Sequence, residues 1–231
     1  RSNLSLIVPL TNGGYLLGAS SRADTGYEKS EDSRGFYMDY WIIRLDANGN
    51  QLWDKTIGGP GDDYLHDVIE TDDGGFLLAG YSRGPDPGTG YDKTAESRSS
   101  EKDYWVVKVD ANGNKQWDKV YGGINSDHCY DIVRTQDGNY LLVGSSNSEA
   151  SFEKSEEPKG GYSLYNDDGW IIKIDPNGNQ LWDKTIGGSF EDKFKKAIPT
   201  SDGGFLLGGE SRSNSSFDKS QNSRGSKDYW L

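Results

Sequence analysis

Residue types that many activities need are scarce in this sequence. Among 231 residues there is one cysteine, Cys129, which has no partner for an internal disulfide, and there are two histidines, His66 and His128. Hydrophobic residues make up only 32%, and the apolar stretch at 6–10 is far shorter than the roughly 20 residues of a membrane-spanning helix. Lysine and arginine total 25 against 37 acidic residues, and the net charge of −12 repels a phosphate backbone. We therefore expect neither nucleic-acid binding nor membrane insertion.

Aromatic residues, by contrast, are frequent and fall at regular positions. A first column of tryptophans recurs at intervals of 64, 65 and 60 residues and comprises Trp41, Trp105, Trp170 and Trp230. A second column follows 12 residues after the first, always before Asp-Lys, and comprises Trp53, Trp117 and Trp182. Such self-similarity at a fixed period is typical of repeat architectures.

Each repeat consists of short apolar runs bounded by Gly and Asn, which predict strands rather than helices. In the second repeat we expect strands at 64–71, 76–82, 104–109 and 115–121. Asp-Gly and Asn-Gly pairs lie between the first two and the last two strands, where tight hairpin turns need positive φ. Each repeat is therefore predicted to form one small antiparallel sheet.

These features predict an all-β fold, a β-propeller of four-stranded blades with long inserted loops between the second and third strands, in an incomplete ring. The whole chain, 1–231, forms one propeller region with repeats at about 1–59, 60–123, 124–188 and 189–231. A β-helix has shorter periods, and a sandwich does not repeat its sequence, so both are weaker alternatives. The tryptophans are expected to pack between neighbouring blades.

The last repeat stops at Trp230 and Leu231, inside its third strand. We expect the chain to belong to a longer polypeptide, so this sequence does not fix the number of blades.

The inserted loops carry a motif of their own. Each contains an aromatic residue, a carboxylate, a lysine and a hydroxyl, and three continue to Ser-Arg, whereas the third reads Pro158-Lys159-Gly160. The candidate ligand-binding residues are the charged members of this motif: Glu28, Lys29, Arg34, Asp92, Lys93, Arg98, Glu153, Lys154, Asp218, Lys219 and Arg224. All the loops join the same pair of strands, so the fold gathers them on one side, where a ligand could bind. Alternatively, these charges only order long polar loops through ion pairs and hydrogen bonds.

No cofactor is expected, although calcium stays open. The Asp-Ala-Asn-Gly-Asn turn at 46–50 recurs at 110–114 and, with Pro, at 175–179. Its alternating oxygens resemble the start of a calcium loop, but the Gly and Glu that such a loop needs at its sixth and twelfth positions are missing. A hairpin turn explains this motif without an ion, and carboxylates of the inserted loops are a separate calcium candidate.

Catalysis has little support in the sequence. The two histidines occupy different columns of the repeat, and neither lies near a nucleophile motif. Paired carboxylates such as Asp62 and Asp63 recur where strands and turns meet, which favours a structural role. We therefore predict that the protein is not an enzyme.

The segments DYWIIRLDANGNQLWDKTIGG (39–59) and TDDGGFLLAGYS (71–82) resemble the propeller-type repeats of large extracellular proteins of Bacteroidota. The resemblance covers nearly the whole chain and concerns the repeat, not an activity. Proteins with such repeats are often exported by type IX secretion, so the resemblance implies an extracellular or cell-surface location.

The leading hypothesis is a secreted or cell-surface binding module that contacts a glycan or a surface protein through its inserted loops. The uniformity of the repeats favours a second hypothesis, a structural spacer in a large surface protein. A polysaccharide-acting enzyme is a third.

Overall fold

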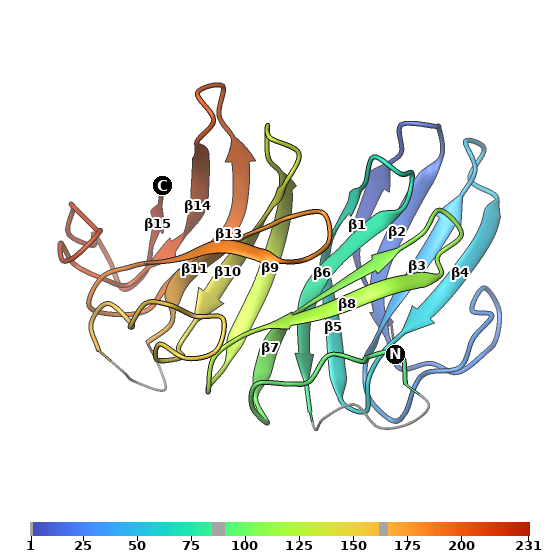
Figure 1. The fold of residues 1–231 in the computed structure, drawn as a ribbon, viewed down its shortest axis with the longest axis horizontal. Coiled ribbons are helices and arrows are strands. Elements are labelled where there is room, and N and C mark those ends of the chain that lie inside the picture. The colour runs from blue at the N-terminus through green and yellow to red at the C-terminus, as the bar shows by residue number, and fades with distance from the viewer. Residues whose placement is uncertain (1, 85–90, 162–165) are drawn as a thin grey trace. The chain divides into compact units, whose positions relative to one another are not determined.

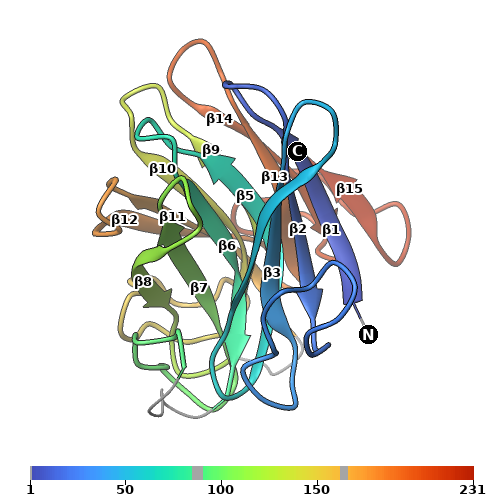
Figure 2. The ribbon, with the colours of Figure 1, turned by 90° about the vertical axis from the view of Figure 1, so that its right-hand side faces the viewer.

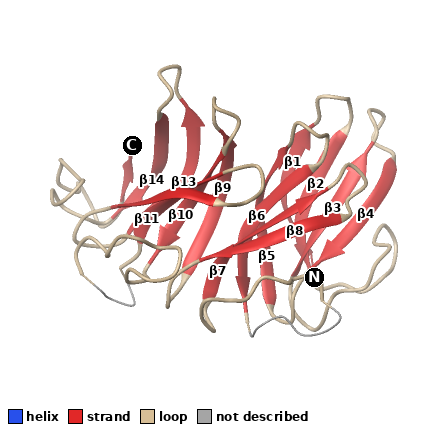
Figure 3. Cartoon of the chain, in the orientation of Figure 1, coloured by secondary structure: helices blue, strands red, loops and turns tan. Residues whose placement is uncertain are grey.

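A computed structural model describes residues 2–84, 91–161 and 166–231, and the secondary structure of these residues consists of strands without any helix (Figure 3). Accordingly, none of them forms a helix long and apolar enough to cross a membrane. The strands are β1 (Ser2–Pro9), β2 (Tyr15–Ser21), β3 (Asp39–Leu45), β4 (Gln51–Ile57), β5 (Asp62–Glu70), β6 (Phe76–Arg83), β7 (Lys102–Val109), β8 (Lys115–Tyr121), β9 (Asp127–Arg134), β10 (Tyr140–Ser146), β11 (Asp168–Ile174), β12 (Gln180–Ile186), β13 (Asp192–Pro199), β14 (Phe205–Ser211) and β15 (Asp228–Trp230).

Each sequence repeat forms its own sheet, as predicted. Three sheets have four strands, in the orders β1-β2-β3-β4, β5-β6-β7-β8 and β9-β10-β11-β12, and the fourth has the order β13-β14-β15 (Figure 1). Neighbouring strands are antiparallel wherever their register is described. The all-β class and the repeated four-stranded sheet are therefore confirmed, and they are consistent with a propeller-like arrangement. No strand pairing joins one sheet to another among the described residues, so hydrogen bonds close no ring there.

The chain divides into two compact units. The N-terminal unit comprises 1–100 and 105–120, and the C-terminal unit comprises 101–104 and 121–231. In the N-terminal unit, β1, β2 and β3 lie side by side (Figure 2), and β5 packs against all three. In the C-terminal unit, β13 packs in the same way against β9, β10 and β11.

The hairpin turns have the chemistry that the sequence indicates. In the turn after β3, Asp46 Oδ1 accepts hydrogen bonds from the backbone N–H groups of Asn48 and Asn50, both at 2.8 Å, and Gly49 has a φ of 85°. The corresponding aspartates, Asp110 and Asp175, make the same bonds. These carboxylates are engaged by the turns themselves, which fixes the register of the third and fourth strands.

Two bulges recur in the sheets. The pairing of each first strand with its second shifts at the column that holds His66, Tyr130 and Lys195. A second shift lies between the third and fourth strands at Leu52 and Leu181. A bulge bends a strand and redirects its side chains. Leu52 and Leu181 are accordingly 58% and 50% exposed.

A tyrosine and a tryptophan from consecutive repeats form the recurring core contact. Tyr40 lies 4.8 Å from Trp105, measured between ring centroids, and donates its hydroxyl to the Trp105 carbonyl at 3.0 Å. Tyr104 repeats both contacts with Trp170, at 4.9 Å and 2.9 Å. All four side chains are fully buried. The Asp-Tyr-Trp motif therefore encodes the packing of one sheet on the next.

The third repeat replaces this tyrosine with Gly169. A Cβ atom at this position would lie 2.2 Å from the ring of Phe194, which comes from β13 of the next repeat. Phe194 stacks on Trp230 with ring centroids 5.2 Å apart. The missing ring is thus supplied from the neighbouring sheet.

The prediction that every tryptophan is core requires a correction. In the first column Trp105 and Trp170 are fully buried, whereas in the second column Trp182 is 40% exposed. Trp53 is intermediate and packs against Phe76, with ring centroids 6.4 Å apart. The second column lies on the fourth strand, at the margin of each sheet, where a ring is only partly covered.

Candidate functional site

The inserted loops begin with a tight turn that recurs in three of them. In the first loop, Gly26 and Lys29 exchange two backbone hydrogen bonds of 3.0 Å, and Tyr27, the first of the two residues between them, has a φ of 52°. The corresponding aromatics Phe152 and Phe217 have φ values of 48° and 47°. Positive φ is unusual for a bulky residue and costs energy unless the surroundings hold it.

These three aromatic rings point into solvent. Tyr27 is 105% exposed, Phe152 66% and Phe217 68%. Each ring therefore combines a strained backbone with an exposed apolar surface, although neither property helps folding. The sequence motif contains these aromatics, but the predicted ligand-binding residues are its charged members.

The four motif lysines are buried and anchor the loops. Lys29 Nζ donates to Thr56 Oγ1 at 2.6 Å and to the Glu31 carbonyl. Lys154 Nζ bonds the equivalent partners, Thr185 Oγ1 and the Glu156 carbonyl. Burial lowers the pKa of Lys29 and of Lys154, and nearby aspartates oppose that effect.

The other two lysines use local hydroxyls. Lys93 Nζ donates to Ser97 Oγ at 2.6 Å, and Lys219 Nζ donates to Ser211 Oγ at 2.8 Å. Buried ammonium groups with such partners hold a long polar loop against its sheet. This placement agrees with the structural interpretation of the lysines.

The motif carboxylates link each loop to the preceding repeat. Asp92 accepts from the Gly58 N–H at 3.2 Å, Glu153 from the Gly122 N–H at 3.4 Å, and Asp218 from the Gly187 N–H at 3.1 Å. Each of these glycines follows a fourth strand. Glu28 is exposed, and its carbonyl accepts a bond from Gln51.

The motif arginines differ in their roles. Arg34 Nε pairs with Asp92 at 2.6 Å, and its guanidinium also bonds Glu31 and the Thr56 carbonyl. Burial lowers the pKa of Arg34, but its bonds to Asp92 and Glu31 outweigh this and raise it. In the third loop, Lys159 replaces the arginine and lies 3.9 Å from Asp218.

Arg98 is half-buried, like Arg34, whereas Arg224 is exposed. Arg98 bonds the Glu96 carbonyl at 3.2 Å, and the Arg224 backbone N–H donates to Asp228. Ion pairs between charged motif residues thus join the first loop to the second, through Arg34 and Asp92, and the third loop to the fourth, through Lys159 and Asp218.

Paired aspartates lie beneath the loops where one repeat follows another. Asp63, Asp127 and Asp192 are fully buried, and each accepts the N–H of the second Gly of a Gly-Gly pair, at 2.6–2.8 Å. Burial raises the pKa of Asp63 and of Asp127 to about 7, and the charges of Asp39 and Asp103 respectively add to this. Burial likewise raises the pKa of Asp168 to about 7. Each junction therefore holds a carboxylate that binds a proton near neutral pH.

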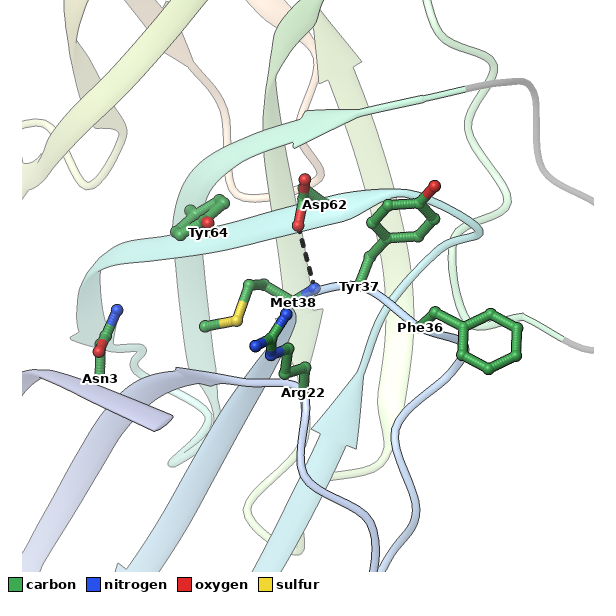
Figure 4. Close-up of a pocket in the computed structure, with 7 residues that line it drawn as sticks. All are labelled: Asn3, Arg22, Phe36, Tyr37, Met38, Asp62 and Tyr64. Carbon is green, nitrogen blue, oxygen red and sulfur yellow. Dashed lines mark hydrogen bonds between the residues drawn. The ribbon is translucent and has the colours of Figure 1, made fainter. Parts of the chain in front are cut away.

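A pocket opens beside the first loop, with a volume of about 480 Å³. Figure 4 shows its lining residues, Asn3, Arg22, Phe36, Tyr37, Met38, Asp62 and Tyr64. Asp62 accepts a hydrogen bond from the Met38 N–H at 3.1 Å, which ties the loop to β5. None of the residues predicted to bind a ligand lines this pocket. Its signal was Phe-Tyr-Met at 36–38, which no other repeat contains.

A shallower groove lies beside the third loop, with a volume of about 550 Å³. It is lined by Phe152, Glu153, Ser155, Gln180, Leu181, Trp182 and Asp183. The exposed ring of Phe152 and the bulged Leu181 thus share one surface with Trp182.

Aromatic rings and a lysine are neighbours of the two histidines. His66 stacks on Tyr81 with ring centroids 5.4 Å apart, and His128 Nε2 lies 3.0 Å from Lys102 Nζ. No group of three or more His, Cys, Asp or Glu side chains is arranged to hold a metal ion within 2–84, 91–161 and 166–231.

Comparison with models of protein families and with curated proteins finds no match for this chain.

Proposed function

We propose that the protein is a non-enzymatic, extracellular or cell-surface binding module, built as blades of a β-propeller, that contacts a glycan through its inserted loops. The exposed aromatic rings of Tyr27, Phe152 and Phe217, each at a left-handed turn, are the observation that supports this proposal.

The left-handed turns of the loops are energetically unfavourable by themselves and are held by buried side chains. A residue with a side chain in the left-handed region costs roughly 1–2 kcal/mol, and glycine or asparagine at the same position would avoid much of this. Buried lysines such as Lys29 and Lys154 nevertheless fix the turn in that conformation. Strain that a rigid surrounding maintains is typical of functional positions. Here its result is an aromatic ring held in solvent.

A glycan suits such a surface. The apolar face of a sugar ring packs on an aromatic ring, and polar side chains beside it bond the hydroxyls. The groove at Phe152 combines the two, because Glu153, Gln180 and Asp183 adjoin the rings of Phe152 and Trp182. Recurrence of the aromatic in several loops fits a ligand that itself repeats, such as a polysaccharide.

The test replaces the three loop aromatics with asparagine, Tyr27→Asn, Phe152→Asn and Phe217→Asn together. Because Asn tolerates positive φ, the variant should keep or exceed the thermal midpoint of the wild type. Binding of the best ligand from a glycan array should fall at least tenfold. The matched control is Tyr15→Asn, since Tyr15 is 41% exposed but lies at the hairpin end of β2.

Unchanged glycan affinity in the triple variant would refute a role for these rings. If the array gives no ligand but a surface protein binds through the same rings, the partner class is wrong.

A structural spacer is the second candidate, favoured by the links between consecutive repeats, such as Asp92 to Gly58 and Asp218 to Gly187. A spacer would bind no ligand saturably, so the same array separates it from a binding module.

The proposed location, which follows from the sequence resemblance, is tested separately. Protease added to intact cells of the source organism should digest the protein, or the culture medium should contain it. Complete protection inside the cells would contradict the proposal.

A further inference from the structure

The pocket of the first repeat differs from every other loop region in its chemistry. The sequence Phe36-Tyr37-Met38 occurs only there. The lining is completed by Asn3 from β1, Arg22 after β2, and Asp62 and Tyr64 from β5, and the Asp62 carboxylate is engaged by the Met38 N–H. Tyr37 is half exposed, whereas Met38 is buried and forms the floor. A site where a repeat protein departs from its own pattern is a place to look for a specific ligand, because folding alone would be served by the common residues.

Arg22 supplies the positive charge of this pocket. No hydrogen bond or ion pair joins its side chain to a described residue, and Figure 4 shows it reaching from the end of β2 toward Met38 and Asp62. In the fourth repeat the corresponding arginine, Arg212, pairs with Glu191 at 2.8 Å. In the first repeat, the position equivalent to Glu191 is occupied by Arg1, a residue that lies outside the described part of the chain. The first repeat therefore has the arginine but not the acidic residue that pairs with it in the fourth repeat.

An arginine guanidinium presents a planar set of donors that matches a carboxylate. Around it, the pocket offers the rings of Tyr37 and Tyr64 and the amide of Asn3, groups that suit the face and the hydroxyls of a sugar. Its volume of about 480 Å³ lies within the range of roughly 300–1,000 Å³ typical of small-molecule sites.

We propose that this pocket binds a sugar residue carrying a carboxylate, such as a hexuronic acid. Arg22 pairs with the carboxylate, and Tyr37 and Tyr64 contact the ring. This assignment rests on the proposed function and names the ligand class at one of its loops. The net charge of −12 repels a polyanion as a whole. The preferred ligand is therefore an oligosaccharide with an isolated carboxylate rather than a long polyuronate.

The experiment titrates the full chain calorimetrically with a short oligosaccharide that contains one glucuronic acid, and with the same compound after its carboxyl is reduced to an alcohol. The wild type should bind the acidic form at least tenfold more tightly. Arg22→Gln should remove that preference. Arg212→Gln is the matched control, because it removes an arginine from the same repeat position, and it should retain the preference.

Three results would overturn the assignment. Equal affinity of the wild type for the acidic and reduced forms would exclude recognition of the carboxylate. Equal losses in Arg22→Gln and Arg212→Gln would indicate general charge effects. Binding of an acidic peptide in place of both sugars would make the ligand class wrong. If neither oligosaccharide binds while another glycan still binds through Tyr27, Phe152 and Phe217, the pocket assignment fails and the proposed function stands.

Discussion

Raising the pH from about 5.5 to about 8 should destabilise this protein, and one buried carboxylate, Asp127, should account for a measurable part of the loss. Burial raises its pKa from 3.8 to about 7, and the charge of Asp103 adds to this. A carboxyl group whose pKa is raised in the folded state stabilises the fold through its bound proton. This contribution is full below the unfolded pKa of 3.8, declines as the pH rises, and is lost above the folded pKa of about 7.

The magnitude follows from the two pKa values. At about pH 5.5 folded Asp127 is almost wholly protonated, whereas the unfolded side chain is ionised. The proton then stabilises the fold by about 2 kcal/mol, and by about pH 8 the contribution is close to zero. Asp127→Asn cannot ionise and still offers an oxygen to the Gly123 N–H. Its free energy of unfolding should therefore fall by about 2 kcal/mol less than that of the wild type over this range.

Urea denaturation followed by tryptophan fluorescence at both pH values measures the difference. Asp46→Asn is the matched control, because hydrogen bonds within its turn, chiefly from Asn50, lower the pKa of Asp46, so that it titrates below this range. A wild type equally stable at both pH values would refute the reasoning. An Asp127→Asn variant with an unchanged pH dependence would also refute it.

Three further predictions concern folding. Tyr104→Phe removes the bond to the buried Trp170 carbonyl and should lower the free energy of unfolding by about 1–3 kcal/mol in urea denaturation, and an unchanged value would contradict a stabilising role of this bond. Lys154→Met keeps the aliphatic stem but loses the ammonium, so limited proteolysis should cut the third loop faster, and unchanged cleavage would exclude an anchoring role. Gly169→Tyr should destabilise by about 1–3 kcal/mol through overlap with Phe194, and Phe194→Leu in the same chain should recover most of it. Additive losses in the double variant would show that the two positions do not share one space.

Local chemistry explains why the strands were predictable and the loops were not. Asp46 and its equivalents bond to residues of their own turns, so the turn is encoded within a few positions. The lysine at position 29, in contrast, meets Thr56, 27 residues away. Nothing in the motif distinguishes an ammonium that faces a ligand from one that faces its own sheet. The exposure of Tyr27 was hidden for the same reason, since an aromatic residue in a repeat usually belongs to the core.

By itself, the sequence determined the all-β class, the four repeats and the strand pairs, because short apolar runs and Asp-Gly or Asn-Gly turns act over short distances. Only the tertiary structure decided which side chains of one repeat pack into the neighbouring repeat. It placed the ring of Phe194 where Gly169 leaves space, and it placed Arg22 in one pocket with Tyr37 and Tyr64. Both outcomes depend on side chains that lie far apart in the chain and meet only when one sheet packs on another.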